Sequence, residues 1–148
     1  MLSNKAKYGL KAMLFLAERE GLGGQLVADI AETHQMPKKF LDTILLELKN
    51  NGLLYSKKGK GGGYMLARPA AKITVGQIIR ILDGPLAPIP CVSQTAYRRC
   101  LDCADEDACQ VRLVMQQVRD ATAGILDHLS LLEMCKTKGG PVILSYDI

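Results

Sequence analysis

The chain has 148 residues, of which 48% are hydrophobic, and a formal net charge of +4. This length suits one globular core, or a small domain with an added oligomerisation element, and excludes a large multidomain protein. No apolar run approaches the roughly 20 residues that cross a bilayer, and the first residues lack the apolar core of a signal peptide. We therefore expect a cytoplasmic protein.

Positive charge is concentrated in the first half of the chain. Residues 1–72 contain twelve Lys or Arg and six Asp or Glu, whereas residues 73–148 contain seven and nine. The two halves therefore carry charges of +6 and −2. A positively charged half is typical of a surface that meets a polyanion, although solvated faces of many other proteins carry as much charge.

Three helices are predicted in the first fifty residues. Ser3 is a suitable N-cap for the first helix, which ends before Gly21. A short second helix spans residues 26–34. Pro37 then opens a third helix at the position where its missing N–H costs least, and Asn50 lies at the end of that helix. The second and third helices together predict a helix-turn-helix.

A β-hairpin is predicted directly after these helices. Residues 53–57 and 64–67 are short strand candidates, and four glycines and two lysines lie between them. Glycine permits positive φ and a close approach to another surface. A nucleotide-binding loop would end in Gly-Lys-Ser/Thr before a helix, whereas a strand follows here. The hairpin therefore predicts the wing of a winged helix, with lysines near DNA phosphates and a tip that reaches a minor groove.

The second half of the chain is predicted to be helical on either side of a loop. A fourth helix begins after Thr74 and ends near Asp83, and three prolines then prevent regular helix as far as Cys91. From about residue 106 to 135, apolar residues recur at steps of three and four, which predicts one long amphipathic helix. Because so small a domain cannot cover its stripe, we expect it to pair with a second copy; the alternative is packing on its own domain.

Four of the five cysteines lie within nineteen residues, at Cys91, Cys100, Cys103 and Cys109. They occupy a polar loop rather than an apolar periodic run, so burial as small hydrophobic side chains does not readily explain them. A reducing compartment disfavours stable disulfides, which favours metal binding or redox chemistry. Cys135 stands apart from this group and is expected to have no part in it.

The chain resembles a known family of regulators at three points. These are the hairpin sequence KGKGGGYMLA at residues 58–67, the preceding pattern Leu45-x-x-Leu48-x-x-x-Gly52-Leu53, and the cysteine loop before a long helix. The family is that of the iron–sulfur cluster regulator IscR, the nitric-oxide-sensing repressor NsrR, the rhizobial iron regulator RirA and the cysteine-metabolism regulator CymR. The resemblance covers residues 1 to about 134. It implies a dimeric winged-helix transcription factor, most often a repressor, in which the long helix forms the dimer.

The resemblance also implies a ligand set for an iron–sulfur cluster in the loop. Cluster-binding relatives use three cysteines with five residues between the last two, an arrangement that Cys91, Cys103 and Cys109 match. Cys100 is then an extra thiol that could complete an all-thiolate set. Some relatives have a histidine three residues after the last cysteine, where this chain has Arg112. The fourth ligand and the cluster type, 2Fe-2S or 4Fe-4S, therefore stay open.

Three other interpretations of the loop also stay open. The Cys100-x-x-Cys103 pair lies beside Arg98 and Arg99 and could act as a direct thiol sensor with a depressed thiol pKa. Four thiolates equally suit structural zinc. The loop could also hold no cofactor.

The predicted DNA-facing residues come from the third helix and the hairpin. The first turn of the helix is expected to face the major groove, where Lys38 and Lys39 contact phosphate or a guanine edge and Thr43 touches a base or a phosphate. Without the hairpin, a solvated helix face would explain the two lysines as well. The complete predicted set is Lys38, Lys39, Thr43, Lys58, Lys60, Gly61, Gly62 and Tyr64.

The sequence thus predicts a mainly α-helical protein with a small β-hairpin. Its parts are a winged helix-turn-helix domain (1–84), a cysteine-rich sensor loop (85–105), a dimerisation helix (106–135) and a tail (136–148). We expect a homodimer that binds double-stranded DNA as a sequence-specific transcriptional regulator, a repressor, with its affinity set by an iron–sulfur cluster or by thiol state. The alternative is a zinc-stabilised or cofactor-free regulator. No catalytic constellation is visible, and a thiol–disulfide oxidoreductase, the competing class, would need a β–α–β context that the Cys100–Cys103 pair lacks.

Overall fold

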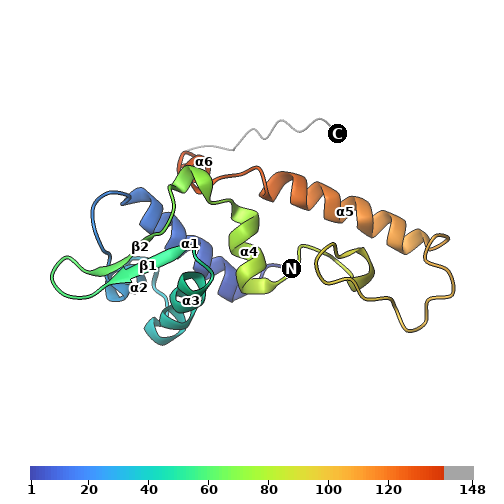
Figure 1. Ribbon diagram of the computed structural model, residues 1–148, viewed down its shortest axis with the longest axis horizontal. Coiled ribbons are helices and arrows are strands. Elements are labelled where there is room, and N and C mark those ends of the chain that lie inside the picture. Colours follow the sequence, from blue (N-terminus) through green and yellow to red (C-terminus); the bar gives the residue numbers. More distant parts are fainter. Residues whose placement is uncertain (139–148) are drawn as a thin grey trace.

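The structure is a computed structural model that describes residues 1–138, and Figure 1 shows a helical body with a hairpin at one side and a helix that extends from the other. The elements, in chain order, are α1 (Asn4–Glu18), α2 (Val27–His34), α3 (Lys38–Asn50), β1 (Leu54–Lys57), β2 (Gly63–Leu66), the 3-10 turn η1 (Ala70–Lys72), α4 (Val75–Asp83), the 3-10 turn η2 (Pro90–Val92), α5 (Gln110–Leu126) and α6 (Leu131–Cys135). The mainly helical fold with one hairpin is confirmed.

Helices α1, α3 and α4 begin where the start signals in the sequence place them. Ser3 Oγ accepts a hydrogen bond from the Ala6 N–H at 3.0 Å, and α3 starts directly after Pro37. Thr74 and Gln77 form a capping box at the start of α4, each side chain bonding the backbone N–H of the other. These caps satisfy N–H groups that have no partner inside the helix, so they fix the boundaries as well as stabilising the ends.

The hydrophobic core is built around α1, which contacts α3, α4 and α6. Gly9 marks the closest approach of α1 to α4, because a Cβ there would lie 2.2 Å from Leu82 Cδ1. Burial of each large aliphatic side chain contributes roughly 1.5–3 kcal/mol relative to exposure. The largest fully buried side chains are Met13, Ile30, Leu41, Ile44, Leu45, Leu48, Leu53, Ile73, Ile78 and Leu131.

The wing is the antiparallel pair β1–β2, with Leu54 opposite Leu66 and Lys57 opposite Gly63. The connection between α1 and α2 adds one further bridge to its outer edge. The Gln25 N–H donates to Tyr64 O at 3.0 Å, and the Tyr64 N–H donates to Gln25 O at 2.9 Å. A Cβ at Gly63 would lie 2.3 Å from Gln25 O, so the close approach requires glycine. The Gly24 N–H also donates to Gly61 O at 3.2 Å, so the wing is attached to the helical body beside its turn.

The prediction of one continuous helix over residues 106–135 is wrong. Helix α5 ends at Leu126, and α6 starts again after Ser130, which forms a capping box with Glu133. The chain between the two helices runs antiparallel to the segment before α4, since the Leu131 N–H donates to Ile73 O and the Val75 N–H donates to Leu129 O, both at 2.9 Å. The C-terminal part of the predicted stripe therefore packs on its own domain, as the alternative interpretation proposed.

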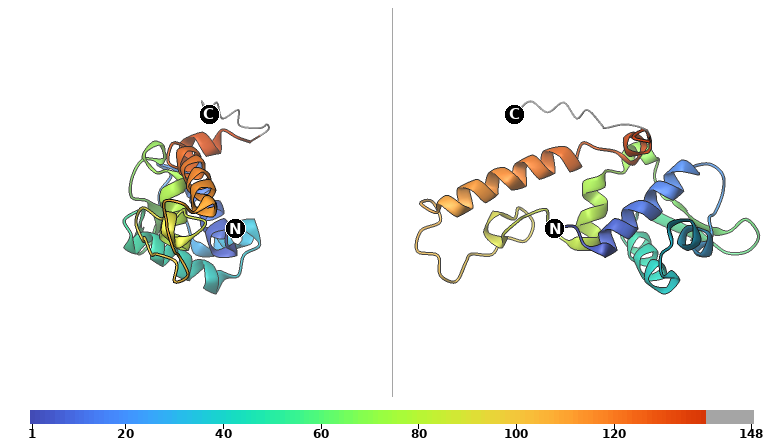
Figure 2. Two further views of the ribbon diagram at one scale, coloured as in Figure 1. Left: turned by 90° about the vertical axis from the view of Figure 1, so that its right-hand side faces the viewer. Right: turned by 180° about the vertical axis from the view of Figure 1, so that it is seen from behind.

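Helix α5 has the opposite character, because none of its residues is buried within the described chain. The right-hand view in Figure 2 shows it extending away from the helical body, with the cysteine loop along it. Val111, Val114 and Val118 are 63%, 53% and 44% exposed. Within residues 1–138, no helix is long and apolar enough to cross a membrane. Most of the predicted tail lies outside the described residues.

Candidate nucleic-acid interface and cysteine loop

The first turns of α3 present the three polar side chains that the sequence predicted. Lys38, Lys39 and Thr43 are exposed, while the apolar side of the helix faces the core. The Lys38 ammonium lies 3.4 Å from the Asp42 carboxylate, and the Thr43 hydroxyl donates to Lys39 O at 3.2 Å. An exposed ion pair of this kind is worth at most about 1 kcal/mol. Lys38 can therefore exchange the carboxylate for a phosphate at little cost.

The tip of the wing carries a second group of exposed cations. Lys58, Lys60 and Gly61 are exposed, as predicted. Lys57 is also exposed, and we did not select it from the sequence although the run Lys57-Lys58-x-Lys60 shows it. The wing is tied to the recognition helix, because Lys49 Nζ of α3 donates to Ser56 Oγ of β1 at 2.8 Å. The two groups of cations thus belong to one connected unit.

Two residues of the predicted contact set have other roles in the structure. Gly62 is buried, its N–H donates to Gly59 O at 3.0 Å, and a Cβ would lie 2.3 Å from Lys57 O. It is a turn residue, and its N–H is not available to a phosphate. Tyr64 is half-buried and packs against the core. Burial, with a smaller effect of the Asp42 carboxylate, raises the pKa of Tyr64.

The two ends of the cysteine loop are anchored. Cys91 lies in η2 and is 5% exposed. Arg119 Nη1 of α5 donates to the carbonyl of the next residue, Val92, at 2.6 Å. At the other end Cys109 is the N-cap of α5, where its Sγ accepts the Arg112 N–H at 3.4 Å. Cys91 and Cys109 are therefore both held against α5.

The middle of the loop is open to solvent. Cys100 is exposed and Cys103 is half-buried. The pKa of the Cys100 thiol is raised, mainly by partial loss of hydration. A hydrogen bond with the Cys91 thiol and the charge of Asp102 add smaller effects in the same direction. Arg99 donates to the backbone carbonyl of Cys103 at 3.3 Å instead of pairing with a thiolate. The alternative in which neighbouring arginines depress the thiol pKa of the Cys100–Cys103 pair therefore does not hold for Cys100.

The donor chemistry of the loop fits an iron–sulfur cluster, because the irons of such a cluster are held by soft thiolate ligands and the loop has four thiols. Arg112 Nε is buried without a hydrogen-bond partner in the described chain, and its main-chain N–H already bonds the Cys109 sulfur. A cationic donor of this kind suits an anionic neighbour. Cys100 lies beside the Cys91 thiol, but among residues 1–138 no three Cys, His, Asp or Glu side chains are arranged to hold a metal ion.

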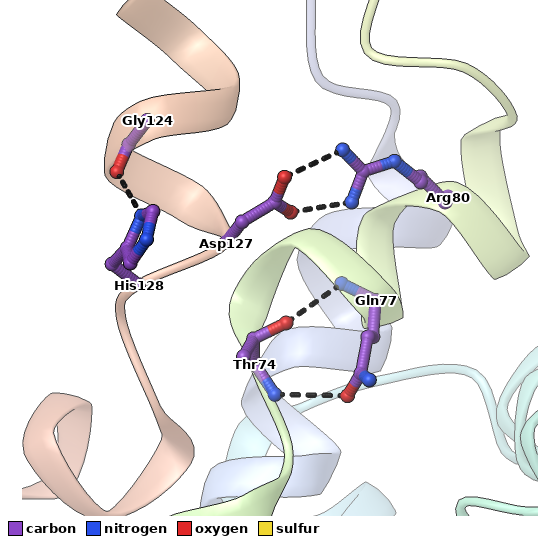
Figure 3. A network of polar contacts seen from close by, with 6 residues as sticks. All are labelled: Thr74, Gln77, Arg80, Gly124, Asp127 and His128. Atoms are coloured by element: carbon purple, nitrogen blue, oxygen red, sulfur yellow. Dashed lines mark hydrogen bonds and ion pairs between the residues drawn. The ribbon is translucent and has the colours of Figure 1, made fainter. Parts of the chain in front are cut away.

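A clamp of polar contacts joins the end of α5 to α4 (Figure 3). The Arg80 guanidinium donates to both carboxylate oxygens of Asp127, at 2.5 and 2.9 Å. Gly76 makes room for this carboxylate, because a Cβ would lie 2.2 Å from its Oδ1. The hydrogen bonds from Arg80 lower the pKa of Asp127. The sequence does not show this clamp, because its partners are 47 residues apart.

This fold, with exposed cations on a helix-turn-helix and on its wing, defines a DNA-binding winged-helix transcriptional regulator. Residues 2–137 match the Rrf2 family, described as "Iron-dependent Transcriptional regulator". The chain belongs to the Rrf2 family. The predicted class of protein is thereby confirmed, as is the prediction that the chain is not an enzyme, because the relatives are transcriptional regulators.

Individual relatives resemble the chain over nearly its whole length. An rrf2-like HTH-type transcriptional regulator of Rhodobacter capsulatus is 39% identical over 137 residues, which are 90% of this chain and 91% of the relative. The structure of CymR, the global cysteine regulator of Bacillus subtilis, matches with a TM-score of 0.78 and 30% identity, covering 93% of this chain and 98% of CymR. The structure of IscR from T. potens matches with a TM-score of 0.74 and 27% identity, covering 99% and 93%.

Proposed function

We propose that the protein is a homodimeric, sequence-specific repressor whose affinity for its operator follows the chemical state of the cysteine loop. The observation that carries this proposal is the position of the loop. It leads from the DNA-binding domain to α5 and is anchored on α5 at both ends, through the Arg119–Val92 contact and the Cys109 N-cap. A change in the loop therefore acts first on the placement of α5. Because the operator is DNA, we also propose that the protein works in the cytoplasm.

The exposed side of α5 supports the dimer. Val111, Val114 and Val118 follow one another at helical spacing and are all largely exposed in the single chain. A helix with such a stripe is stabilised when a partner helix covers it, and a second copy supplies an identical stripe around a twofold axis. We propose that this stripe is the centre of the dimer interface.

The clamp supports a mechanical connection from α5 to the DNA-binding surface. The Arg80–Asp127 pair fixes the end of α5 on α4, and α4 is joined to the start of α1 because the Ser3 N–H donates to Asp83 Oδ2 at 3.0 Å. Two recognition helices must meet half-sites about one DNA turn, roughly 34 Å, apart. A small rotation of α5 in the dimer would therefore misplace both helices and lower specific affinity.

Two chemical states of the loop could produce such a rotation. In the first, Cys91, Cys103 and Cys109 hold an iron–sulfur cluster, with Cys100 as the fourth ligand. A bound cluster would supply sensitivity to oxidants and to iron supply. This state has the support of the donor chemistry and of the iron-dependent description of the family. In the second, the thiols themselves are oxidised, which the exposure of Cys100 permits.

The experiment combines cofactor analysis with operator binding. Protein purified without oxygen is analysed for iron, sulfide, zinc and visible absorption, and operator affinity is compared for the purified, the cofactor-free and the peroxide-treated forms. We expect affinities that differ by at least about 1 kcal/mol, the lower end of common allosteric couplings. Ser substitution of Cys91, Cys103 or Cys109 should abolish cluster binding, whereas Cys135→Ser should retain it. Equal affinity of all forms would refute the sensor while leaving DNA binding intact, and stoichiometric zinc would favour the zinc-stabilised regulator.

A further inference from the structure

A cavity of about 280 Å³ lies between the end of α1, the connection that follows it and strand β2 of the wing. It opens to solvent, and Leu16, Arg19, Glu20, Met65 and Leu66 are among the residues that line it. Small-molecule sites usually have volumes of roughly 300–1,000 Å³, so this cavity suits a ligand at the small end of that range. Tyr64 is also among the lining residues, whereas the exposed lysines of α3 and the wing and the four loop cysteines are not.

The cavity exists because the connection between α1 and α2 pairs with β2 at only one residue. Gln25 exchanges two hydrogen bonds with Tyr64, but the preceding residue, Gly24, donates to Gly61 O of the wing turn at 3.2 Å, so the chain leaves the edge of β2 before it reaches Leu66. The Ala67 N–H donates to Leu53 O across the hairpin, so Leu66 and Leu54 form a pair that does not exchange hydrogen bonds. The N–H and C=O of Leu66 therefore point to the same side as those of Tyr64, toward the cavity. One donor and one acceptor of an open strand edge thus face a small ligand.

Two opposite charges at the end of α1 line the same cavity. Glu20 Oε1 accepts the Ala70 N–H at 3.1 Å, which fixes the side chain and leaves its second oxygen for another donor. The Arg19 guanidinium lies 3.4 Å from the centre of the Phe15 ring and donates to Phe15 O at 3.1 Å. Its contact with Glu18 is long, at 3.8 Å. Both charged groups are thus held in place by neutral protein groups and retain hydrogen-bonding capacity.

We propose that this cavity binds a free α-amino acid with an apolar side chain. Its ammonium group donates to the Leu66 carbonyl and to Glu20, its carboxylate accepts from the Leu66 N–H and from Arg19, and its side chain lies against Leu16 and Met65. A simple anion would lie beside the like charge of Glu20, and a simple cation would lie beside the like charge of Arg19. A zwitterion offers an opposite charge to each of them. The ligand is one residue long because Gln25 already occupies the strand edge at Tyr64.

The test uses L-leucine as the probe and full-length protein without DNA. Calorimetry and the backbone amide resonance of Leu66 should show saturable binding of L-leucine. N-acetyl-L-leucine, which lacks the ammonium, and L-leucine methyl ester, which lacks the carboxylate, should each bind at least about tenfold more weakly, since each loses a charge-assisted contact. The derivatives test the site without any change to the protein.

A pair of variants assigns the ammonium contact. Glu20→Gln keeps an oxygen for the Ala70 N–H but removes the charge, so it should weaken L-leucine binding about tenfold and leave N-acetyl-L-leucine unaffected. Glu32→Gln, an exposed carboxylate on α2, should change neither affinity. The proposal is overturned if L-leucine, L-methionine and L-phenylalanine at millimolar concentration give no saturable signal, or if the acetylated derivative binds as tightly as L-leucine. Because no DNA is present, this result is independent of the operator experiment.

Discussion

Asp127 connects the charge of a single residue to the stability of the fold. Its carboxylate accepts two hydrogen bonds from Arg80, which lower its pKa below the ordinary value of 3.8. A group with a depressed folded-state pKa contributes stability that is present above the unfolded pKa and is lost as the pH falls through the folded one. The two side chains are 34% and 37% exposed, so solvent screening reduces the contribution to about 1 kcal/mol.

Asp127→Asn should therefore lower the free energy of unfolding at neutral pH by about 1 kcal/mol. The difference from the natural protein should shrink as the pH is lowered from about 4 and vanish below the depressed pKa, where Asp127 is itself protonated. Urea unfolding at a series of pH values measures both effects. Glu32→Gln serves as the control on an exposed carboxylate. A difference that is constant across the acid range would show that the carboxylate charge is not what stabilises the clamp.

Single residues also show what the sequence could and could not predict about the site. The exposed lysines of α3 and the wing were predictable, because charge and helical phase place them on the outside. The role of Gly62 as a turn residue was not predictable, because the direction of its N–H depends on the turn that it closes with Gly59. The raised pKa of Cys100 likewise depends on lost hydration and on the Cys91 thiol, nine positions away in the chain. The contact between Cys91 and Cys100 leaves no local pattern in the sequence.

Among the elements, α3 and the wing carry the electrostatic part of the DNA interaction. Replacement of Lys38, Lys39, Lys58 or Lys60 by Ala should weaken operator binding, because each substitution removes one predicted phosphate contact. The slope of log K against log salt should become less steep by roughly 0.9 for each contact that is lost. Titrations at several salt concentrations measure this slope.

Lys136→Ala provides the matched control for these substitutions. It removes the same charge from an exposed residue at the end of α6, on the opposite side of α1 from α3 (Figure 1). We expect it to leave the salt slope unchanged. If all four DNA-face variants behave as this control does, the assignment of the surface is incorrect.

The elements also show where periodicity misleads. Helices α1, α3 and α4 were predictable because local residues mark their starts, at Ser3, Pro37 and Thr74. The break between α5 and α6 was not seen, because the apolar stripe continues across it. A local signal was present: Ser130 and Glu133 have the spacing of a capping box. That signal does not reveal the segment that pairs with the break. The break is stabilised by pairing with the segment before α4, more than fifty residues earlier in the chain.

At the scale of the whole molecule, residues 1–138 form a packed body and one projecting helix. The body buries its apolar residues within one chain, whereas α5 leaves an apolar stripe uncovered. The short helix α6 belongs to the body, because Leu131 is fully buried there. The proposed dimer interface is therefore confined to α5, and a substitution on its stripe should separate assembly from folding.

Val118→Asp tests this separation. An aspartate on the stripe would have to lose its hydration without a partner, which costs several kcal/mol in an interface but nothing comparable in a monomer whose Val118 is already 44% exposed. We therefore expect a folded monomer by sedimentation, with an unchanged circular dichroism spectrum and with loss of tight operator binding, because one domain meets only one half-site. Gln116→Glu introduces the same charge on another side of α5 and should remain dimeric. An intact dimer of Val118→Asp would place the interface elsewhere, and an unfolded protein would mean that α5 also supports the body.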